Sequence, residues 1–259
     1  MRSAGMAEAR VAAPSIAAKR RCPPVRWAKV RAALQCALVN EAGMTGMTRV
    51  VLIRHGETVW NEQGRMQGQQ DSPLTPLGLA QARMLAARVK DMAMDVLYSS
   101  DLGRAHQTAR CIADVTGHEI VIDARLRERS FGVFEGLTNA EIAVRYPEDS
   151  VLFAKRDPDY RMPGGETARE FQDRCIACLD EISHRHAGGT VAVVSHGLVL
   201  DALYRAAMRM GLTEPRGFPL LNCSLNTFHR APDCWQAIEV GDVSHLSEDA
   251  ITRFDGTAV

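Results

Sequence analysis

Two apolar segments of this sequence each end in a histidine that is followed by a glycine. The segment RVVLIRHG places Arg54, His55 and Gly56 in succession, and the segment TVAVVSHG places His196 before Gly197. The guanidinium group of arginine binds phosphate through paired hydrogen bonds, and a neutral imidazole is a competent nucleophile near pH 7. These residue types therefore predict a site that binds a phosphoryl group and accepts it on a histidine.

Two further residues have the chemistry that such a site needs. Arg104 begins the amphipathic segment after the apolar run DVLYSS, and with Arg54 and His196 it would neutralise a transferring phosphoryl group without a metal ion. A leaving alkoxide needs a proton, and Glu128 follows the third apolar run. A phosphate dianion beside this carboxyl group would raise its pKa, so Glu128 can serve as general acid and then as base toward water. The alternative for Glu128 is a surface ion pair with a neighbouring arginine.

The order of apolar and amphipathic segments predicts the elements that position these residues. Strands are expected at 49–54, 95–100, 119–123 and 190–195, followed by an antiparallel pair formed by SLNTFHR and CWQAIEVG. Helices between the strands favour an α/β fold, a three-layer α/β/α sandwich with a mostly parallel sheet. Ligands bind such sheets beyond the carboxyl ends of the strands, where His55 and His196 converge if their strands are neighbours. Gly56 and Gly197 would then let a ligand approach the backbone.

Helix boundaries and an inserted region can also be predicted. Thr75 can cap a helix with Pro76 in its first turn, and Asp101 can cap the helix after the second strand. A long helix is expected at about 166–187. Residues 129–165 lose the alternation and contain several glycines and prolines, which indicates a small cap region inserted into the domain.

Composition indicates a cytoplasmic protein without a membrane span. Seven cysteines are an odd number and do not form a disulfide framework, and no apolar run approaches the ~20 residues that cross a bilayer. Cys175 and Cys178 form a C-x-x-C motif inside a predicted helix, with no second ligand pair, which favours ordinary core packing over redox or metal chemistry. No nucleic-acid or membrane partner is expected.

The zero net charge hides a difference between the two parts of the chain. Residues 1–46 carry eight basic and two acidic residues, which leaves 23 basic and 29 acidic residues after position 46. We expect residues 1–46 to be a disordered extension, with an upstream start codon or an arginine-rich targeting peptide as alternatives. The globular domain is expected at 47–259.

Five segments together resemble the signature blocks of a known family. RHGETVWN, SSDLGRAHQTA, LRERSFGVFEG, PGGET and SHG occur in this order, and they resemble the histidine phosphatase superfamily in its phosphoglycerate-mutase-like branch. The resemblance covers residues 48–245. The tail NCSLNTF…GDVSHL is similar to bacterial proteins labelled as cofactor-dependent phosphoglycerate mutase homologues.

The resemblance implies a role for each site residue. His55 would be the phosphorylated nucleophile and Glu128 the proton donor. The implied catalytic set is Arg54, His55, Arg104, Glu128 and His196. The implied substrate-binding set is Arg54, Thr58, Asn61, Gln67, Gly68, Arg104 and Gly197. Members that place the acid beside the second histidine have aspartate where this chain has Gly197, which supports Glu128 as the acid. One departure is His106, where close relatives have a second arginine, and it implies a weaker or pH-dependent hold on the substrate.

Three functions are consistent with this pattern. We favour a metal-independent phosphomonoester hydrolase that acts through a phosphohistidine on a small phosphorylated metabolite and needs no cofactor. The alternative is a cofactor-dependent phosphoglycerate mutase, which would need 2,3-bisphosphoglycerate and further cations in the cap. A non-catalytic protein that binds phosphorylated ligands is the third. The sequence leaves open whether the chain forms a homodimer.

Overall fold

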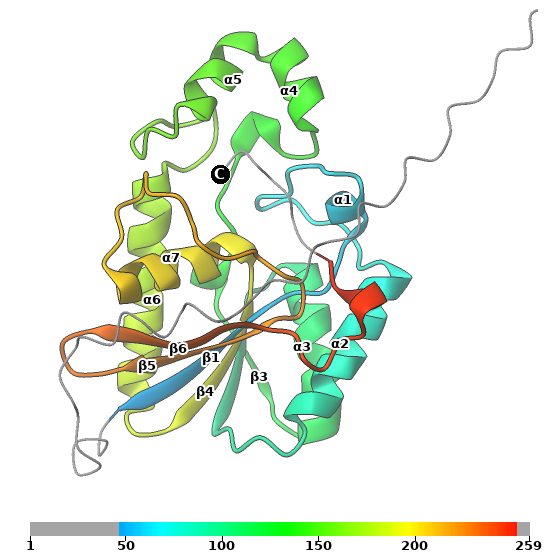
Figure 1. The fold of residues 1–259 in the computed structure, drawn as a ribbon, viewed down its shortest axis with the longest axis vertical. Helices are drawn as coiled ribbons and strands as arrows, with labels where there is room; N and C mark the ends of the chain where they lie inside the picture. Colours follow the sequence, from blue (N-terminus) through cyan, green and yellow to red (C-terminus); the bar gives the residue numbers. More distant parts are fainter. Residues whose placement is uncertain (1–46, 253–259) are drawn as a thin grey trace, which may run out of the picture. The chain divides into compact units, whose positions relative to one another are not determined.

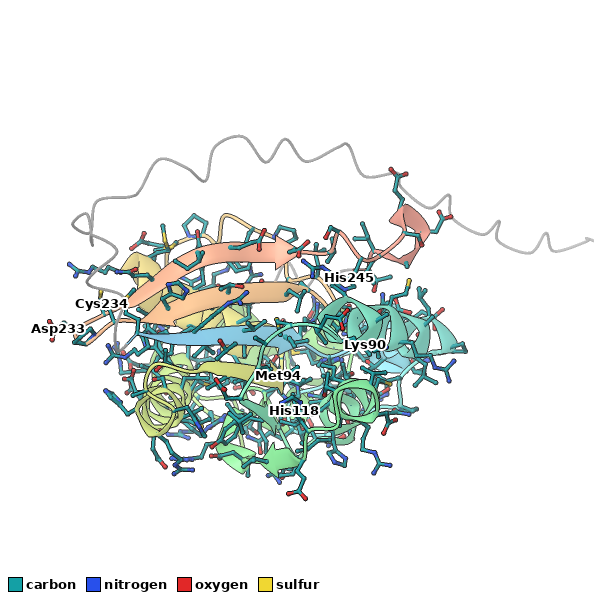
Figure 2. All side chains as sticks on the ribbon, turned by 90° about the horizontal axis from the view of Figure 1, so that it is seen from below. Lys90, Met94, His118, Asp233, Cys234 and His245 are labelled. Carbon is teal, nitrogen blue, oxygen red and sulfur yellow. The ribbon has the colours of Figure 1, made fainter. Side chains whose placement is uncertain are left out.

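A six-stranded sheet forms the centre of the computed structural model, which describes residues 47–252. The strands are β1 (Thr48–Arg54), β2 (Val96–Ser99), β3 (Ile120–Ile122), β4 (Thr190–Ser195), β5 (Leu225–Arg230) and β6 (Trp235–Asp242). Their order in the sheet is β3-β2-β4-β1-β5-β6, and Figure 2 shows them stacked from β6 to β3. The first four are parallel, whereas β5 and β6 are antiparallel, as the sequence predicts. The predicted α/β sandwich is confirmed.

The central strands are buried on both faces because their side chains alternate between two cores. One core contains Val50, Leu52, Val191 and Val193, and the other contains Val51, Ile53, Ala192 and Val194. This period of two explains why the strands are near-continuous apolar runs in the sequence. The apolar runs therefore stiffen the sheet edge from which the site residues project.

Four long helices cover the two faces of the sheet. Helices α2 (Pro76–Val89) and α3 (Gly103–Thr116) pack on one face, and α6 (Ala168–Arg185) and α7 (Gly197–Met208) on the other (Figure 1). Cys175 and Cys178 are fully buried in α6, which confirms the core-packing interpretation of the C-x-x-C motif. Among residues 47–252, no helix is long and apolar enough to cross a membrane.

One predicted helix cap is wrong and another is confirmed. The Thr75 hydroxyl accepts a hydrogen bond from the Gly78 amide at the start of α2, as expected. Asp101 does not cap α3, whose N-cap is Leu102 and has no side-chain bond. The Asp101 carboxylate instead accepts the Nε–H of Arg127 at 2.8 Å. The ion pair with a residue distant in sequence outcompetes the local cap, because a charge-assisted bond is the stronger of the two.

The cap region contains short helices that stand beyond the carboxyl edge of the sheet (Figure 1). It comprises the 3-10 turn η4 (Gly132–Phe134) and helices α4 (Asn139–Arg145) and α5 (Pro147–Ala154). Phe134 is fully buried and makes ring contacts with Tyr146 and Phe153. Aromatic packing therefore holds the segments of the cap together. The remaining elements are α1 (Val59–Glu62), η3 (Ala124–Leu126) and η5 (Glu248–Ala250). Residues 1–46 lie outside the described residues, so the predicted extension stays a prediction.

Candidate active site

The two histidines lie side by side at the carboxyl edge of the sheet. Strands β1 and β4 are parallel neighbours, with Arg54 opposite Ser195, so the next residue of each strand is a histidine. The rings of His55 and His196 are 5.3 Å apart between centroids, at an interplanar angle of 62°. Both side chains are buried. The convergence that the sequence predicted is therefore present.

The hydrogen bonds of His55 place its ring hydrogen on Nδ1 and a lone pair on Nε2. Nδ1 lies 2.7 Å from the carbonyl oxygen of Gly56, which only accepts, so Nδ1 carries the hydrogen. Nε2 then accepts the Nε–H of Arg104 at 3.3 Å. Burial and the charges of Arg104 and Arg54 lower the pKa of His55 well below its ordinary value. The imidazole is thus neutral, which a nucleophile requires.

Arg104 is held by the loop that joins α1 to α2. Its Nη2 atom donates to the Gly68 carbonyl at 2.7 Å, and Nη1 donates to the Gln70 carbonyl at 2.9 Å and to Asp71 at 3.1 Å. Gly68 has a φ of +55°, and a Cβ there would lie 2.1 Å from a carboxyl oxygen of Glu135. Glycine at this position therefore lets the loop close against Glu135 and fix the guanidinium beside His55.

Arg54 presents an unpartnered donor to the site. Nη1 donates to the Leu220 carbonyl at 2.5 Å, whereas Nε is buried without a hydrogen-bond partner. Burial, reinforced by the charges of Arg104 and Arg216, lowers the pKa of Arg54 to about 10, and Glu128 opposes this shift. The group is still a cation at neutral pH, and a phosphoryl oxygen would satisfy its free N–H.

Gly56 makes room for protein atoms, which corrects the sequence prediction for this glycine, whereas ligand approach at Gly197 stays a prediction. A Cβ at Gly56 would lie 2.5 Å from the carbonyl oxygen of Gly78, so this glycine lets the edge of β1 pack against the start of α2. A Cβ at Gly197 would lie 3.1 Å from Leu220 and 3.4 Å from Nε of Arg54. Gly197 does line the cavity, but Gly56 does not.

His196 directs one ring nitrogen to the protein and leaves the other free. Nε2 lies 2.9 Å from the hydroxyl of Ser100, while Nδ1 is buried without a partner. The Ser100 oxygen accepts the amide of Leu102 at 3.3 Å, and its hydroxyl group can donate to Nε2 in one of the two His196 tautomers. With that bond formed, Nδ1 carries the hydrogen and is a second unused donor next to His55.

The carboxyl group of Glu128 lies in the cavity wall and is held by two backbone amides. Its oxygens accept the Arg129 amide at 2.9 Å and the Leu198 amide at 3.1 Å. Burial raises the pKa of Glu128, although these two bonds and the charges of Arg104 and Arg54 act in the opposite direction. The structure thus raises this pKa before any phosphate arrives, whereas the sequence argument relied on the phosphate alone.

A partly buried ion pair braces the segment that carries Glu128. Arg174 of α6 pairs with Glu166 at 2.8 Å and donates to the carbonyls of Arg125 and Arg127 at 2.7 and 3.1 Å. Glu166 in turn accepts the Ser130 amide at 2.9 Å. Glu166 belongs to the PGGET block, so this motif serves to fix the position of the acid.

The remaining predicted residues form a hydrogen-bonded corner around α1. Asn61 accepts the Thr58 amide at 3.2 Å and the side-chain amide of Asn222 at 3.4 Å, which leaves its own amide hydrogens without a recorded partner among residues 47–252. Thr58 is fully buried and donates to Gln67 at 2.9 Å. Asn61, Gln67 and Gly68 line the cavity, whereas Thr58 lies behind them. Substrate contact by Thr58 stays a prediction.

The cavity also has residues that the sequence did not indicate. They are Met66, Phe131, Leu198, Arg216 and Leu220. The four apolar residues carry no signal in a single sequence, because an apolar residue in a loop or a helix more often packs than binds. Arg216 is an isolated cation in TEPRGFP, which has no helical or strand period. Within the described residues, no group of three or more histidine, cysteine or acidic side chains is arranged to hold a metal ion.

Comparisons with known proteins agree with this arrangement. Residues 50–243 match the histidine phosphatase superfamily (branch 1). The chain is 39% identical over 213 residues to a protein of Yersinia pestis named "Probable phosphoglycerate mutase GpmB", covering 79% of this chain and 98% of that protein.

Two solved structures have the same fold. YhfR from Bacillus stearothermophilus is 35% identical with a TM-score of 0.72, covering 77% of this chain and all of that one. A mycobacterial glucosyl-3-phosphoglycerate phosphatase is 28% identical with a TM-score of 0.65, covering 75% and 99%. The family match, which spans most of the chain, and the two histidines at adjacent strand ends lead to one assignment: the chain belongs to branch 1 of the histidine phosphatase superfamily.

Proposed function

We propose that the chain is a phosphomonoesterase that transfers the phosphoryl group of a small metabolite to His55 and then to water, without a metal ion. The observation that carries this proposal is a nucleophilic nitrogen together with two unused donors at the ends of the neighbouring strands β1 and β4. Nε2 of His55 has a lone pair, and Nε of Arg54 and Nδ1 of His196 are donors without protein partners. A phosphoryl group is the ligand that needs one nucleophile and several donors together.

The first step forms the phosphohistidine. Nε2 of His55 attacks phosphorus, and the ester bond between phosphorus and the alcohol oxygen breaks. The hydrogen on Nδ1 stays bonded to the Gly56 carbonyl, which spreads the positive charge that develops on the ring. Arg54, Arg104 and His196 neutralise the oxygens of the phosphoryl group, and the carboxyl group of Glu128 gives its proton to the leaving alkoxide.

The second step returns the enzyme to its starting state. The Glu128 carboxylate takes a proton from water as the water oxygen attacks phosphorus. The bond between phosphorus and Nε2 breaks, inorganic phosphate leaves, and Glu128 is protonated again. One carboxyl group thus serves both steps, which suits a group whose pKa the folded protein raises.

A phosphoglycerate mutase is the second candidate, because the 39% identical relative carries that name. A mutase has to retain a bisphosphate and exclude water while the phosphohistidine exists. Several cap cations are already engaged: Arg161 pairs with Glu170, and Arg129 donates to the Glu166 carbonyl. We therefore favour hydrolysis.

The described cysteines are all unpaired, which supports a reducing cytoplasm as the compartment.

One experiment tests the proposal directly. The purified chain is incubated with p-nitrophenyl phosphate in the presence of EDTA, and with 3-phosphoglycerate plus a trace of 2,3-bisphosphoglycerate. We expect p-nitrophenolate and inorganic phosphate, both absent in His55→Ala. Accumulation of 2-phosphoglycerate without free phosphate would replace the hydrolase by the mutase. Full turnover by His55→Ala would remove the nucleophile assignment.

A further inference from the structure

Arg216 lies in the wall of the active-site cavity, and the chemistry proposed above does not use it. It belongs to the irregular segment between α7 and β5, and its side chain is 15% exposed. Nε donates to the Phe218 carbonyl at 3.2 Å. Nη1 lies 3.5 Å from an oxygen of Asp201, and it has no hydrogen bond. Among the described residues, the five N–H groups of this guanidinium have one hydrogen-bond acceptor.

The contact with Asp201 does not anchor this segment, because Arg205 already does so. Arg205 binds the other oxygen of Asp201 at 2.8 Å and donates to the carbonyls of Gly211 and Glu214 at 2.6 and 2.9 Å. The Asp201 oxygen that faces Arg216 has no hydrogen bond of its own. Asp201 therefore acts as a counter-ion that directs the Arg216 guanidinium toward the cavity while leaving most of its donors unused.

Arg216 adds positive charge to a cavity that already holds two guanidinium groups. Arg54 and Arg104 lie next to His55, and Asp71 pairs with Arg104 at 3.1 Å. Asp201, the carboxylate that pairs with Arg216, also pairs with Arg205. The charge of Arg216 contributes to lowering the pKa of Arg54, so an anion that joins the two guanidinium groups would relieve this repulsion.

We infer that Arg216 binds a second oxyanion of the substrate, a carboxylate or a further phosphate, on the alcohol that leaves. The inference rests on the proposed function, since it names the substrate class of the same site. Arg216 and Leu220, whose carbonyl holds Arg54, lie four residues apart on one segment and line the same cavity as Arg54, so the two anions would bind within one cavity. Met66, Phe131 and Leu198 give the short carbon chain between them an apolar wall.

Non-hydrolysable ligands test this without relying on turnover. Propylphosphonate and 3-phosphonopropionate have the same carbon count and differ only in a methyl group against a carboxylate. Propane-1,3-bisphosphonate carries a second phosphonate on the terminal carbon of propylphosphonate and so separates the two kinds of oxyanion. Dissociation constants for the three are measured by calorimetry. We expect the wild type to bind at least one of the two ligands with a second anionic group about 10- to 100-fold more tightly than propylphosphonate, the range of a charge-assisted hydrogen bond.

Variants test whether Arg216 causes the preference for a second anionic group. Arg216→Met should abolish most of it, whereas Arg216→Lys should keep part of it because the charge remains without the fork. Arg83→Met removes an exposed cation of α2 and is the matched control. Asp201→Asn weakens the ion pair while leaving Arg216 in place, and it should keep the preference. Thermal unfolding of every variant monitors the fold.

Three outcomes would overturn the inference: equal affinity of the wild type for all three ligands, an unchanged ratio in Arg216→Met, or a loss in Asp201→Asn as large as in Arg216→Met. The last would show that the ion pair matters only for structure. A wild type that shows the preference but hydrolyses no phosphomonoester would refute the proposed function and retain the anion subsite. A wild type that hydrolyses phosphomonoesters but shows no preference for a second anionic group would refute the anion subsite and retain the proposed function.

Discussion

Replacing Glu128 by glutamine separates proton transfer from substrate binding more sharply than any other change in this site. Glutamine has nearly the same shape and cannot donate the proton that an alkoxide needs. General acid–base catalysis contributes about 10²- to 10⁴-fold, or about 2.7–5.4 kcal/mol of transition-state free energy. We expect kcat on an alkyl phosphate to fall by that factor, while the dissociation constant of the alkyl phosphonate changes little.

The leaving group shows which half of the reaction is affected. p-Nitrophenolate leaves without a proton, so phosphorylation of His55 by p-nitrophenyl phosphate should remain fast in Glu128→Gln. Attack by water still needs the base, so the phosphohistidine should accumulate. Rapid mixing should therefore show a burst of one p-nitrophenolate per active site, followed by slow turnover. Glu119→Gln, an exposed carboxyl group, is the control and should behave as the wild type.

The structure also predicts what this substitution does to stability. The two Glu128 oxygens accept the Arg129 and Leu198 amides, and glutamine has one acceptor oxygen. One buried amide then faces an NH₂ group, which costs about 1–3 kcal/mol. Against this, the raised pKa means that the folded state disfavours the carboxylate. The carboxyl group of the wild type stabilises the fold below its unfolded pKa of 4.5, and this contribution is lost as pH rises through the folded pKa.

The stability of Glu128→Gln relative to wild type should therefore improve as pH rises from 4.5 toward 8, as measured by thermal unfolding. Equal slowing of alkyl phosphate turnover and of the burst with p-nitrophenyl phosphate would contradict the role of Glu128 as the acid. That result would make Glu128 a residue that positions the substrate. A stability difference that does not change with pH would contradict the raised pKa.

Three other predictions follow from the site and its supports. Burial lowers the pKa of both His55 and His196 well below 6.5, so their neutral forms stabilise the fold above pH 6.5 and this contribution is lost on acidification. The melting temperature should therefore fall between pH 7 and 5, and it should fall less steeply in His196→Asn. The same pH dependence in wild type and variant would contradict the lowered pKa of His196. Arg174→Met should remove the brace behind Glu128 and slow alkyl phosphate cleavage more than the p-nitrophenolate burst. Arg174→Lys should restore part of the alkyl phosphate activity. If the cleavage and the burst slow by the same factor, the ion pair supports only the fold. Gly56→Ala should lower stability by about 1–3 kcal/mol through contact with the Gly78 carbonyl, or roughly 2–12 °C in melting temperature, whereas Gly217→Ala, with open space around it, should not.

The strands and the residues that meet at the carboxyl edge of the sheet could be predicted because their signals are local. A strand that is buried on both faces has to be apolar throughout, so a charged residue at its end marks the sheet edge where ligands bind. Arg54, His55 and His196 stand out for this reason alone. Arg104 and Glu128 follow from the same edge rule, since each comes soon after a strand.

The features that the sequence did not reveal all depend on contacts between distant segments. Asp101 has the residue type and place of a helix cap, but Arg127 competes for it once the chain is folded. Gly56 has the spacing of a ligand-binding glycine, yet what it meets is the backbone of α2. Arg216 lies in a loop without periodicity, so only the folded cavity shows which way it points.

The contacts around Gly197 explain why the candidate acid is Glu128 and not the residue after His196. The residue after His196 is the first of α7, and a side chain there would point at Leu220 and at Nε of Arg54. An aspartate at that position would therefore displace Arg54, the arginine that we propose contacts the phosphoryl group, or pair with it and neutralise it. Glycine at 197 keeps the Arg54 donor free, so the proposed mechanism takes its proton from another strand end. Glu128 would supply that proton while hydrogen-bonded to the Leu198 amide of the same helix, so one helix start would order both the phosphate site and the acid.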